Sequence, residues 1–79
     1  MEISQVKSKL DELVGALKNY SFVDNVTYEF ATDYDVDLKV IFKPNKDRYN
    51  LDEIQCKIQD CEHYLRNNYD EDFEIDWIV

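Results

Sequence analysis

The side chains of this chain that could do chemistry are mostly carboxylates, and three of them alternate with other residues as Asp33, Asp35 and Asp37. This spacing is that of the start of a calcium-binding loop. Such a loop also needs glycine at its sixth position and glutamate at its twelfth, where this chain has Leu38 and Pro44. We therefore predict no bound metal and no other cofactor, and we interpret these carboxylates as charged surface groups.

Nucleophilic chemistry is also disfavoured. His63 is the single histidine, and it lies about 10 Å from Cys56 if both are on one helix, which is beyond hydrogen-bond reach. Cys56 and Cys61 are five residues apart, and on one helix this separation is too great for a disulfide. Gly15 is the only glycine, which excludes a glycine-rich phosphate-binding loop. We predict that the protein is not an enzyme.

Two segments have the apolar periodicity of amphipathic helices. In the first, apolar residues recur at steps of three and four: Ile3, Val6, Leu10, Leu13, Val14 and Leu17. In the second, the corresponding residues are Leu51, Ile54, Ile58, Cys61 and Leu65. Asn50 is a favourable N-cap for the second helix, Arg66 suits the negative end of its dipole, and Asn67 and Asn68 end it.

Three segments alternate between apolar and polar residues with the period of two that indicates strands with one buried face. Their apolar members are Val26, Tyr28 and Phe30; Val36, Leu38, Val40 and Phe42; and Phe73, Ile75, Trp77 and Val79. The polar stretch 32–35 joins the first two strands as a hairpin. The segment 43–49, which contains the only proline, is predicted to be a loop.

The predicted order is α-β-β-α-β, in a single domain of residues 1–79. Each helix has one apolar stripe and the sheet has one apolar face. This predicts an α+β two-layer sandwich, with two helices packed on one face of a three-stranded mixed sheet. A right-handed crossover makes the last strand parallel to the second, and we expect the strand order one, two, three. The last strand then has an edge with unpaired backbone groups.

The net charge of −9 belongs to two stretches of the sequence. Residues 21–38 and residues 69–79 each contain five acidic side chains and no basic ones. The other 50 residues are close to neutral, with eight acidic and nine basic side chains. An acidic excess of this size argues against binding to nucleic-acid phosphates and against docking on anionic membranes.

Strand alternation predicts where these acids point. The polar residues that share the sheet face opposite the helices are Glu29, Asp35, Asp37, Glu74 and Asp76. The hairpin and the approach to the last strand add Asp33, Tyr34, Tyr69, Asp70, Glu71 and Asp72. Tyr34 and Tyr69 fall inside acidic clusters, where an exposed aromatic ring can anchor a protein interface. The alternative interpretation is a plain solvated face that binds nothing.

Like charges on neighbouring strands repel each other, and mixed charges would give solubility without this cost. A one-sided acidic sheet therefore favours a binding role for the residues of this face and its turns. We expect a non-enzymatic inhibitor or DNA-mimic-like masking protein that docks on a basic nucleic-acid-binding partner, such as a nuclease. Phage anti-defence proteins and nuclease-immunity proteins are small acidic proteins of this class, although no motif of the chain matches one of those families.

The alternative function is a homo-oligomeric assembly or scaffold module that uses the exposed sheet edge. Ile41 and Ile78 favour it, because both are apolar residues predicted on the solvent face. The acidic residues of such a homodimer would serve solubility. The N-terminal residues lack the apolar segment of a signal peptide, and both cysteines are interpreted as reduced thiols, so we expect a cytoplasmic protein.

Overall fold

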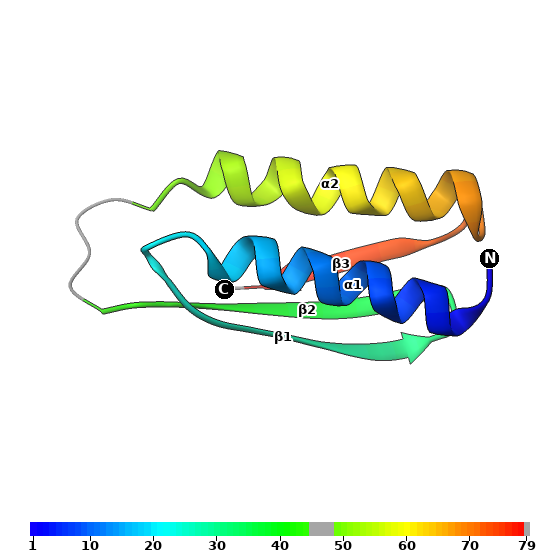
Figure 1. The fold of residues 1–79 in the computed structure, drawn as a ribbon, viewed down its shortest axis with the longest axis horizontal. Coiled ribbons are helices and arrows are strands. Elements are labelled where there is room, and N and C mark those ends of the chain that lie inside the picture. Colours follow the sequence, from blue (N-terminus) through cyan, green and yellow to red (C-terminus); the bar gives the residue numbers. More distant parts are fainter. Residues whose placement is uncertain (45–48, 79) are drawn as a thin grey trace.

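The computed structural model describes residues 1–44 and 49–78, and its elements follow the predicted α-β-β-α-β order (Figure 1). They are helix α1 (Ile3–Lys18), strands β1 (Val23–Thr32) and β2 (Asp35–Phe42), helix α2 (Leu51–Asn68) and strand β3 (Glu74–Ile78). Most of the predicted loop 43–49, and Val79 of the predicted last strand, lie outside the described residues. Within the described part of the chain, neither helix is long and apolar enough to cross a membrane.

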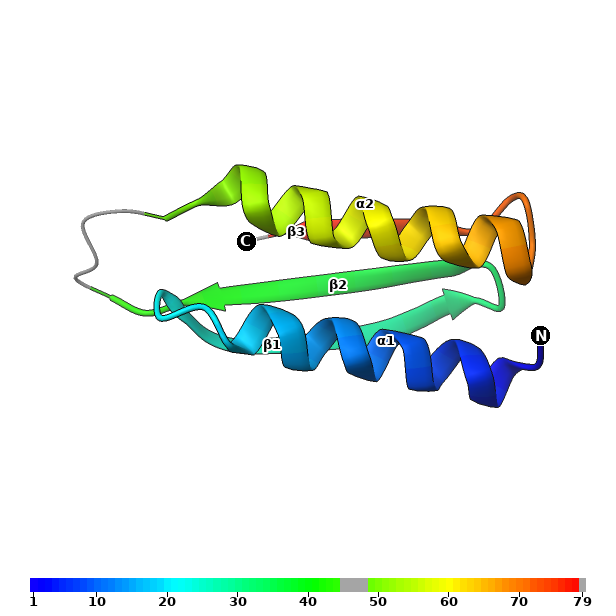
Figure 2. The same cartoon turned by 45° about the horizontal axis from the view of Figure 1, so that its top comes forward.

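The sheet has the predicted order β1-β2-β3, with β1 antiparallel and β3 parallel to β2. Both helices lie on one side of the sheet (Figures 1 and 2). The molecule is elongated along the strands, with principal extents of 39 × 19 × 17 Å. The predicted two-layer α+β sandwich is confirmed, and none of the helices and strands in residues 1–44 and 49–78 covers the other face of the sheet.

The core lies between the two layers, and its buried side chains are Val6, Leu10, Leu13, Leu17, Val23, Val26, Val36, Leu38, Val40, Ile54, Ile58, Cys61, Leu65, Phe73 and Ile75. Two residues of the predicted apolar stripes are instead exposed, Ile3 by 39% and Leu51 by 45%. Each is the first residue of its helix, so no preceding turn packs beside it. The core stripes therefore begin one step later than the periodicity predicts.

The helix ends are set by local hydrogen bonds. Asn50 caps α2 as predicted, because its side-chain oxygen accepts a hydrogen bond from the Glu53 amide at 3.2 Å. At the start of α1, the Gln5 side chain accepts from the Glu2 amide at 2.7 Å. Arg66 lies in the last turn of α2, where its charge suits the helix dipole.

Strand β1 begins three residues before its sequence alternation does. A register irregularity lies between Val23 and Asn25, after which Asn25 pairs with Ile41 and Val26 pairs with Val40. The extra residue shifts the side-chain phase, so that Val23 and Val26 are both buried although they are three positions apart. A strict period of two therefore detects this strand only from Val26 onwards.

Candidate functional site

The strand register gathers the five predicted face carboxylates at one end of the open sheet face. Asp37 of β2 pairs with Glu29 of β1 on one side and with Asp76 of β3 on the other. Asp35 and Glu74 pair in the next row. These two rows contain no basic residue, and all of their acids except the half-buried Asp35 are exposed. We call these five residues the acidic end.

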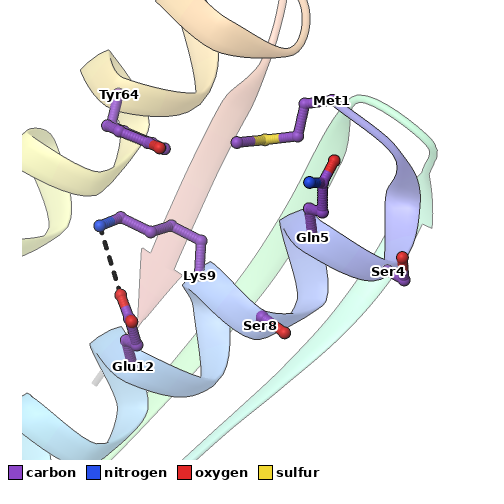
Figure 3. A pocket seen from close by; sticks show the side chains of 7 residues that line it. All are labelled: Met1, Ser4, Gln5, Ser8, Lys9, Glu12 and Tyr64. Atoms are coloured by element: carbon purple, nitrogen blue, oxygen red, sulfur yellow. Dashed lines mark ion pairs between the residues drawn. The ribbon is translucent and has the colours of Figure 1, made fainter.

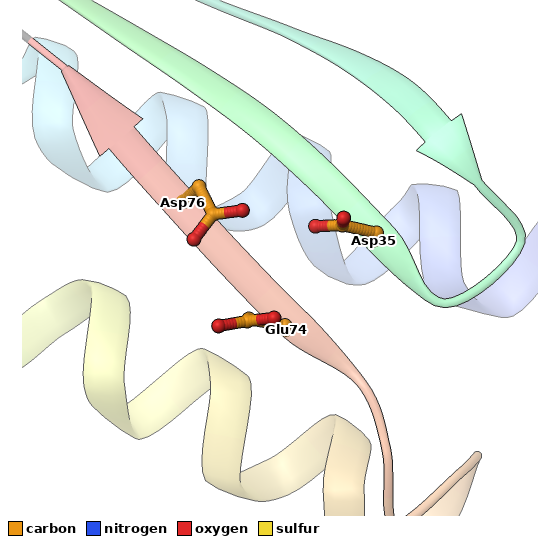
Figure 4. Close-up of side chains that lie close together, drawn as sticks. All are labelled: Asp35, Glu74 and Asp76. Carbon is orange, nitrogen blue, oxygen red and sulfur yellow. The ribbon is translucent and has the colours of Figure 1, made fainter.

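Three members of the acidic end lie closest together, Asp35, Glu74 and Asp76 (Figure 4). One carboxylate oxygen from each lies within 4.8 Å of the other two. Asp35 Oδ1 is shut off from solvent and has no hydrogen-bond partner among the described residues. Burial raises the pKa of the Asp35 carboxyl, and the charges of Asp76 and Asp37 raise it further. In the free protein the acidic end is thus a site of charge repulsion.

These three carboxylates are also the described residues that could hold a cation. Hard cations such as Ca²⁺ and Mg²⁺ take oxygen ligands, and three converging carboxylate oxygens would supply part of their coordination shell. Ca²⁺ takes about six to eight oxygen ligands, which is more than this group provides. The geometry assigns no cofactor, and the absence of one stays a prediction.

The predicted turn residues adjoin the acidic end. The Glu74 amide donates a hydrogen bond to the Tyr34 carbonyl oxygen at 2.8 Å, which joins the β1–β2 turn to the start of β3. The centroids of the Tyr34 and Tyr69 rings are 6.1 Å apart. Burial raises the pKa of Tyr69, and Asp33, Tyr34 and Asp70 raise it further. The two acidic stretches of the sequence therefore meet at one end of the molecule.

The turn residues differ in how free they are to make contacts. Tyr34 is 47% exposed, as an interface anchor requires, whereas Tyr69 is half-buried and its ring packs edge-on against a core phenylalanine. The Asp70 side chain accepts a hydrogen bond from the Asp72 amide at 2.8 Å, so it shapes the turn before β3. Glu71 and Asp72 are exposed. Tyr34, Glu71 and Asp72 are the turn side chains best placed to meet a partner.

Lys39 is a residue of the open face that the sequence prediction overlooked. It pairs with Thr27 and Ile78 in the row that follows the acidic end. Ile78 is 63% exposed. A shallow hollow of about 440 Å³ at this row is lined by Thr27, Tyr28, Glu29, Asp37, Leu38, Lys39 and Ile78. The sequence contained the signal for this placement, because Lys39 is two residues after Asp37 and so points to the same face of the strand. Along the strands, the open face thus changes from acidic rows to a mixed row that contains a lysine.

A second hollow, of about 350 Å³, lies in the helix layer (Figure 3). It is lined by Met1, Ser4, Gln5, Ser8, Lys9, Glu12 and Tyr64. Lys9 Nζ is 3.3 Å from a Glu12 carboxylate oxygen and 4.3 Å from the centroid of the Tyr64 ring. Because this lysine is already paired with both groups, the hollow suits a charged partner less well than the acidic end does.

The two cysteines are free, which agrees with their prediction as unpaired thiols. Cys56 is exposed and Cys61 is buried. Burial raises the pKa of the Cys61 thiol to about 11. Since the thiolate is the nucleophilic form, Cys61 is a core side chain with little reactivity at neutral pH.

Chemically, the acidic end is a surface of hydrogen-bond acceptors. Ionised carboxylates accept charge-assisted hydrogen bonds from lysine and arginine, and an arginine side chain can bind one carboxylate through two parallel bonds. Comparison of this chain with protein-family models, curated proteins and solved structures finds no match. The charge and geometry of the acidic end are therefore the basis for assigning it a partner.

Proposed function

We propose that this protein is a non-enzymatic inhibitor or masking protein whose acidic end docks on the basic surface of a nucleic-acid-binding protein. The observation that carries the proposal is the strand register. It aligns Glu29, Asp37 and Asp76 in one row and Asp35 with Glu74 in the next, with no base in either. Carboxylates in these rows would take the place of phosphates, so the partner could not hold nucleic acid on the same surface.

The energetics of the acidic end favour a bound state. Like charges on adjacent strands cost about 0.2–1 kcal/mol per pair. The pKa of Asp35 is raised first by burial, and the neighbouring Asp76 and Asp37 carboxylates disfavour its ionised form further. A basic partner places a cation beside each carboxylate and removes the repulsion. Complementary charge of this kind also speeds association and makes it sensitive to salt.

The rows next to the acidic end define the extent of the contact. Lys39 begins the mixed row and would repel a basic partner, so the contact ends before it. At the opposite border, the exposed Tyr34 ring offers an aromatic anchor. Within these borders, carboxylates are spaced by about 4.8 Å between strands and about 6.8 Å along a strand. This two-dimensional array suits a groove lined by several lysine and arginine side chains.

Affinity capture with two matched variants tests the proposal. The face variant is Asp35→Asn, Asp37→Asn, Glu74→Gln and Asp76→Asn. The helix-layer variant loses the same number of charges through Glu12→Gln, Asp52→Asn, Glu53→Gln and Asp60→Asn. We expect wild type and the helix-layer variant to retain the same basic nucleic-acid-binding protein from the native host at low salt and to release it at high salt. Equal retention by the folded face variant would refute the proposal.

A further inference from the structure

Two side chains of α2 hold the backbone at the start of β3. The Ile75 amide donates a hydrogen bond to Glu62 Oε2 at 2.8 Å. The Phe73 carbonyl oxygen, just before the strand, accepts one from Arg66 Nε at 2.7 Å. Glu62 Oε1 and Arg66 Nη2 are also paired with each other at 3.4 Å. We call this ion pair, with its two backbone hydrogen bonds, the α2 clasp. The sequence predicted unpaired backbone groups along this edge of the sheet, and the clasp satisfies two of them.

Strand β3 is a short edge strand that is held from two sides at its start. It has five residues, and β2 is its neighbour in the sheet. On that side, the Glu74 amide donates to the Tyr34 carbonyl oxygen at 2.8 Å. Successive residues of a strand direct their backbone groups to opposite sides, so Ile75 faces away from β2 and toward the clasp. The outer side of β3 is therefore attached to α2.

Charge repulsion favours separation of β3 from β2. Glu74 and Asp76 of β3 lie opposite Asp35 and Asp37 of β2, and neither pair includes a base. Figure 4 shows Glu74 and Asp76 beside Asp35, and one carboxylate oxygen from each lies within 4.8 Å of the other two. Like charges at facing positions on adjacent strands destabilise the pairing of the strands. A contact that attaches β3 to the helix layer opposes this separation.

The clasp is itself anchored in the core. Glu62 directly follows the buried Cys61, and Arg66 directly follows the buried Leu65. Four residues separate Glu62 from Arg66, a spacing at which side chains are neighbours on a helix. The Glu62 side chain is 16% exposed, and each of its two oxygens already has a partner. Glu62 thus serves contacts within the molecule and is a poor contact residue for another protein.

We propose that Glu62 and Arg66 are positioning residues of the acidic end. The clasp attaches β3 to α2 and thereby keeps Glu74 and Asp76 beside the carboxylates of β2 against their mutual repulsion. A preformed array of carboxylates binds a basic surface more tightly than a mobile one, because binding does not have to order it. The inference rests on the proposed function for what the array binds, whereas the placement of β3 by the clasp is testable without a partner.

Two substitutions of Glu62 separate the clasp from the net charge. Glutamine retains an oxygen that can accept a hydrogen bond from the Ile75 amide, whereas leucine retains none, and both remove the same negative charge. Glu12→Leu is the matched control, because Glu12 is the acidic member of the other ion pair and its partner Lys9 lies on its own helix. Circular dichroism establishes that each variant is folded.

NMR of the free protein tests the placement of β3. We expect Glu62→Leu to speed hydrogen exchange of the Ile75 amide about tenfold. It should also move the pKa of Asp35 toward its ordinary value of 3.8, because burial and the charge of Asp76 raise this pKa and displacement of β3 reduces both. Glu62→Gln should stay close to wild type in both measurements, and Glu12→Leu should match wild type. An unchanged Asp35 titration in the folded Glu62→Leu variant would overturn the proposal, even with faster exchange at Ile75.

Binding of a short arginine-rich peptide tests the consequence for the acidic end. We expect Glu62→Leu to bind the peptide about fivefold more weakly than Glu62→Gln does at the same net charge, because two of the five carboxylates are displaced. A shifted Asp35 titration with equal peptide affinity would contradict the proposed function and support the clasp. An unchanged titration would contradict the clasp and leave the proposed function intact. Arg66→Met, compared with Arg66→Gln, gives the same readouts if Glu62→Leu does not fold, since both retain the acceptor of the Ile75 hydrogen bond.

Discussion

The helix layer and the sheet layer of this protein differ in their balance of acidic and basic side chains. The two helices carry six acidic and five basic side chains, and both ion pairs found among the described residues lie there, Lys9 with Glu12 and Arg66 with Glu62. The three strands carry six acidic side chains and one basic, Lys39. A mixed surface such as the helix layer is sufficient for solubility. Solubility alone therefore does not account for the one-sided charge of the sheet, and the proposed basic partner would account for it.

The difference arises because adjacent side chains come from the same element in a helix and from different strands in a sheet. On a helix, residues three or four apart are neighbours, so opposite charges can pair within one element. On a sheet, neighbours come from different strands, and the register decides which charges meet. Here the register sets Asp37 between Glu29 and Asp76. Repulsion is thus built into the arrangement of the sheet.

Binding of a cationic peptide tests whether the two layers differ in their affinity for positive charge. We expect a short arginine-rich peptide to shift the NMR amide resonances of the acidic end and to bind the face variant about 50-fold more weakly, because four ion pairs are lost. The helix-layer variant should bind within about twofold of wild type, since its dispersed charges act only through screened long-range attraction. If both variants lost the same affinity for the peptide, binding would depend on the net charge of the protein and not on the acidic end.

The pH dependence of stability is a second test of the difference between the two layers. The pKa of Asp35 in the folded protein is raised above its ordinary value of 3.8, so the folded state holds this proton more tightly than the unfolded state does. The stabilisation from this proton is present below pH 3.8 and is lost as pH rises through the folded pKa. We expect Asp35→Asn to raise the thermal unfolding midpoint at pH 7 and to leave it nearly unchanged at pH 3, as measured by circular dichroism. A lower midpoint at pH 7 would contradict the raised pKa of Asp35 in the folded protein.

The helix layer should respond with the opposite sign. Glu12→Gln removes the partner of Lys9, an exposed pair at three-residue spacing. We expect the free energy of unfolding to fall by about 0.2–0.5 kcal/mol in urea titrations at pH 7. A stabilising effect of Glu12→Gln would remove the contrast between the two layers.

Salt should produce the smallest effect. Screening weakens repulsion among exposed charges, with a Debye length of about 10 Å at 0.1 M salt. Raising the sodium chloride concentration should therefore increase the unfolding midpoint of wild type more than that of the face variant. Differential scanning calorimetry of both proteins measures this difference, and identical salt responses would argue against clustered repulsion at the acidic end.

The fold was predictable because each of its elements has one buried face. Periodicity located both helices and all three strands, and Asn50 located the start of α2. The start of β1 was not predictable, because the irregularity between Val23 and Asn25 breaks the alternation on which the prediction depends. A strand that changes its phase has no simple period in its sequence.

The sequence predicted which residues belong to the candidate site, but it did not predict how close together they lie. Alternation assigned Asp35 and Asp76 to one face, but their close approach depends on a register set by the hairpin and by the α2 crossover. Glu62 Oε2 accepts a hydrogen bond from the Ile75 amide of β3, and Arg66 donates one to the carbonyl oxygen of Phe73, just before β3; both depend on how α2 lies along that strand. Local sequence patterns do not contain these tertiary relations.

Displacement of nucleic acid is the measurement that tests the masking function most directly. The basic protein retained by wild type is loaded with fluorescently labelled nucleic acid and titrated with wild type, the face variant and the helix-layer variant, with anisotropy as the readout. We predict that wild type and the helix-layer variant release the nucleic acid at similar concentrations and that the face variant does not release it. Release by the face variant at the wild-type concentration, or a ternary complex in which wild type binds while the nucleic acid stays bound, would contradict the masking function.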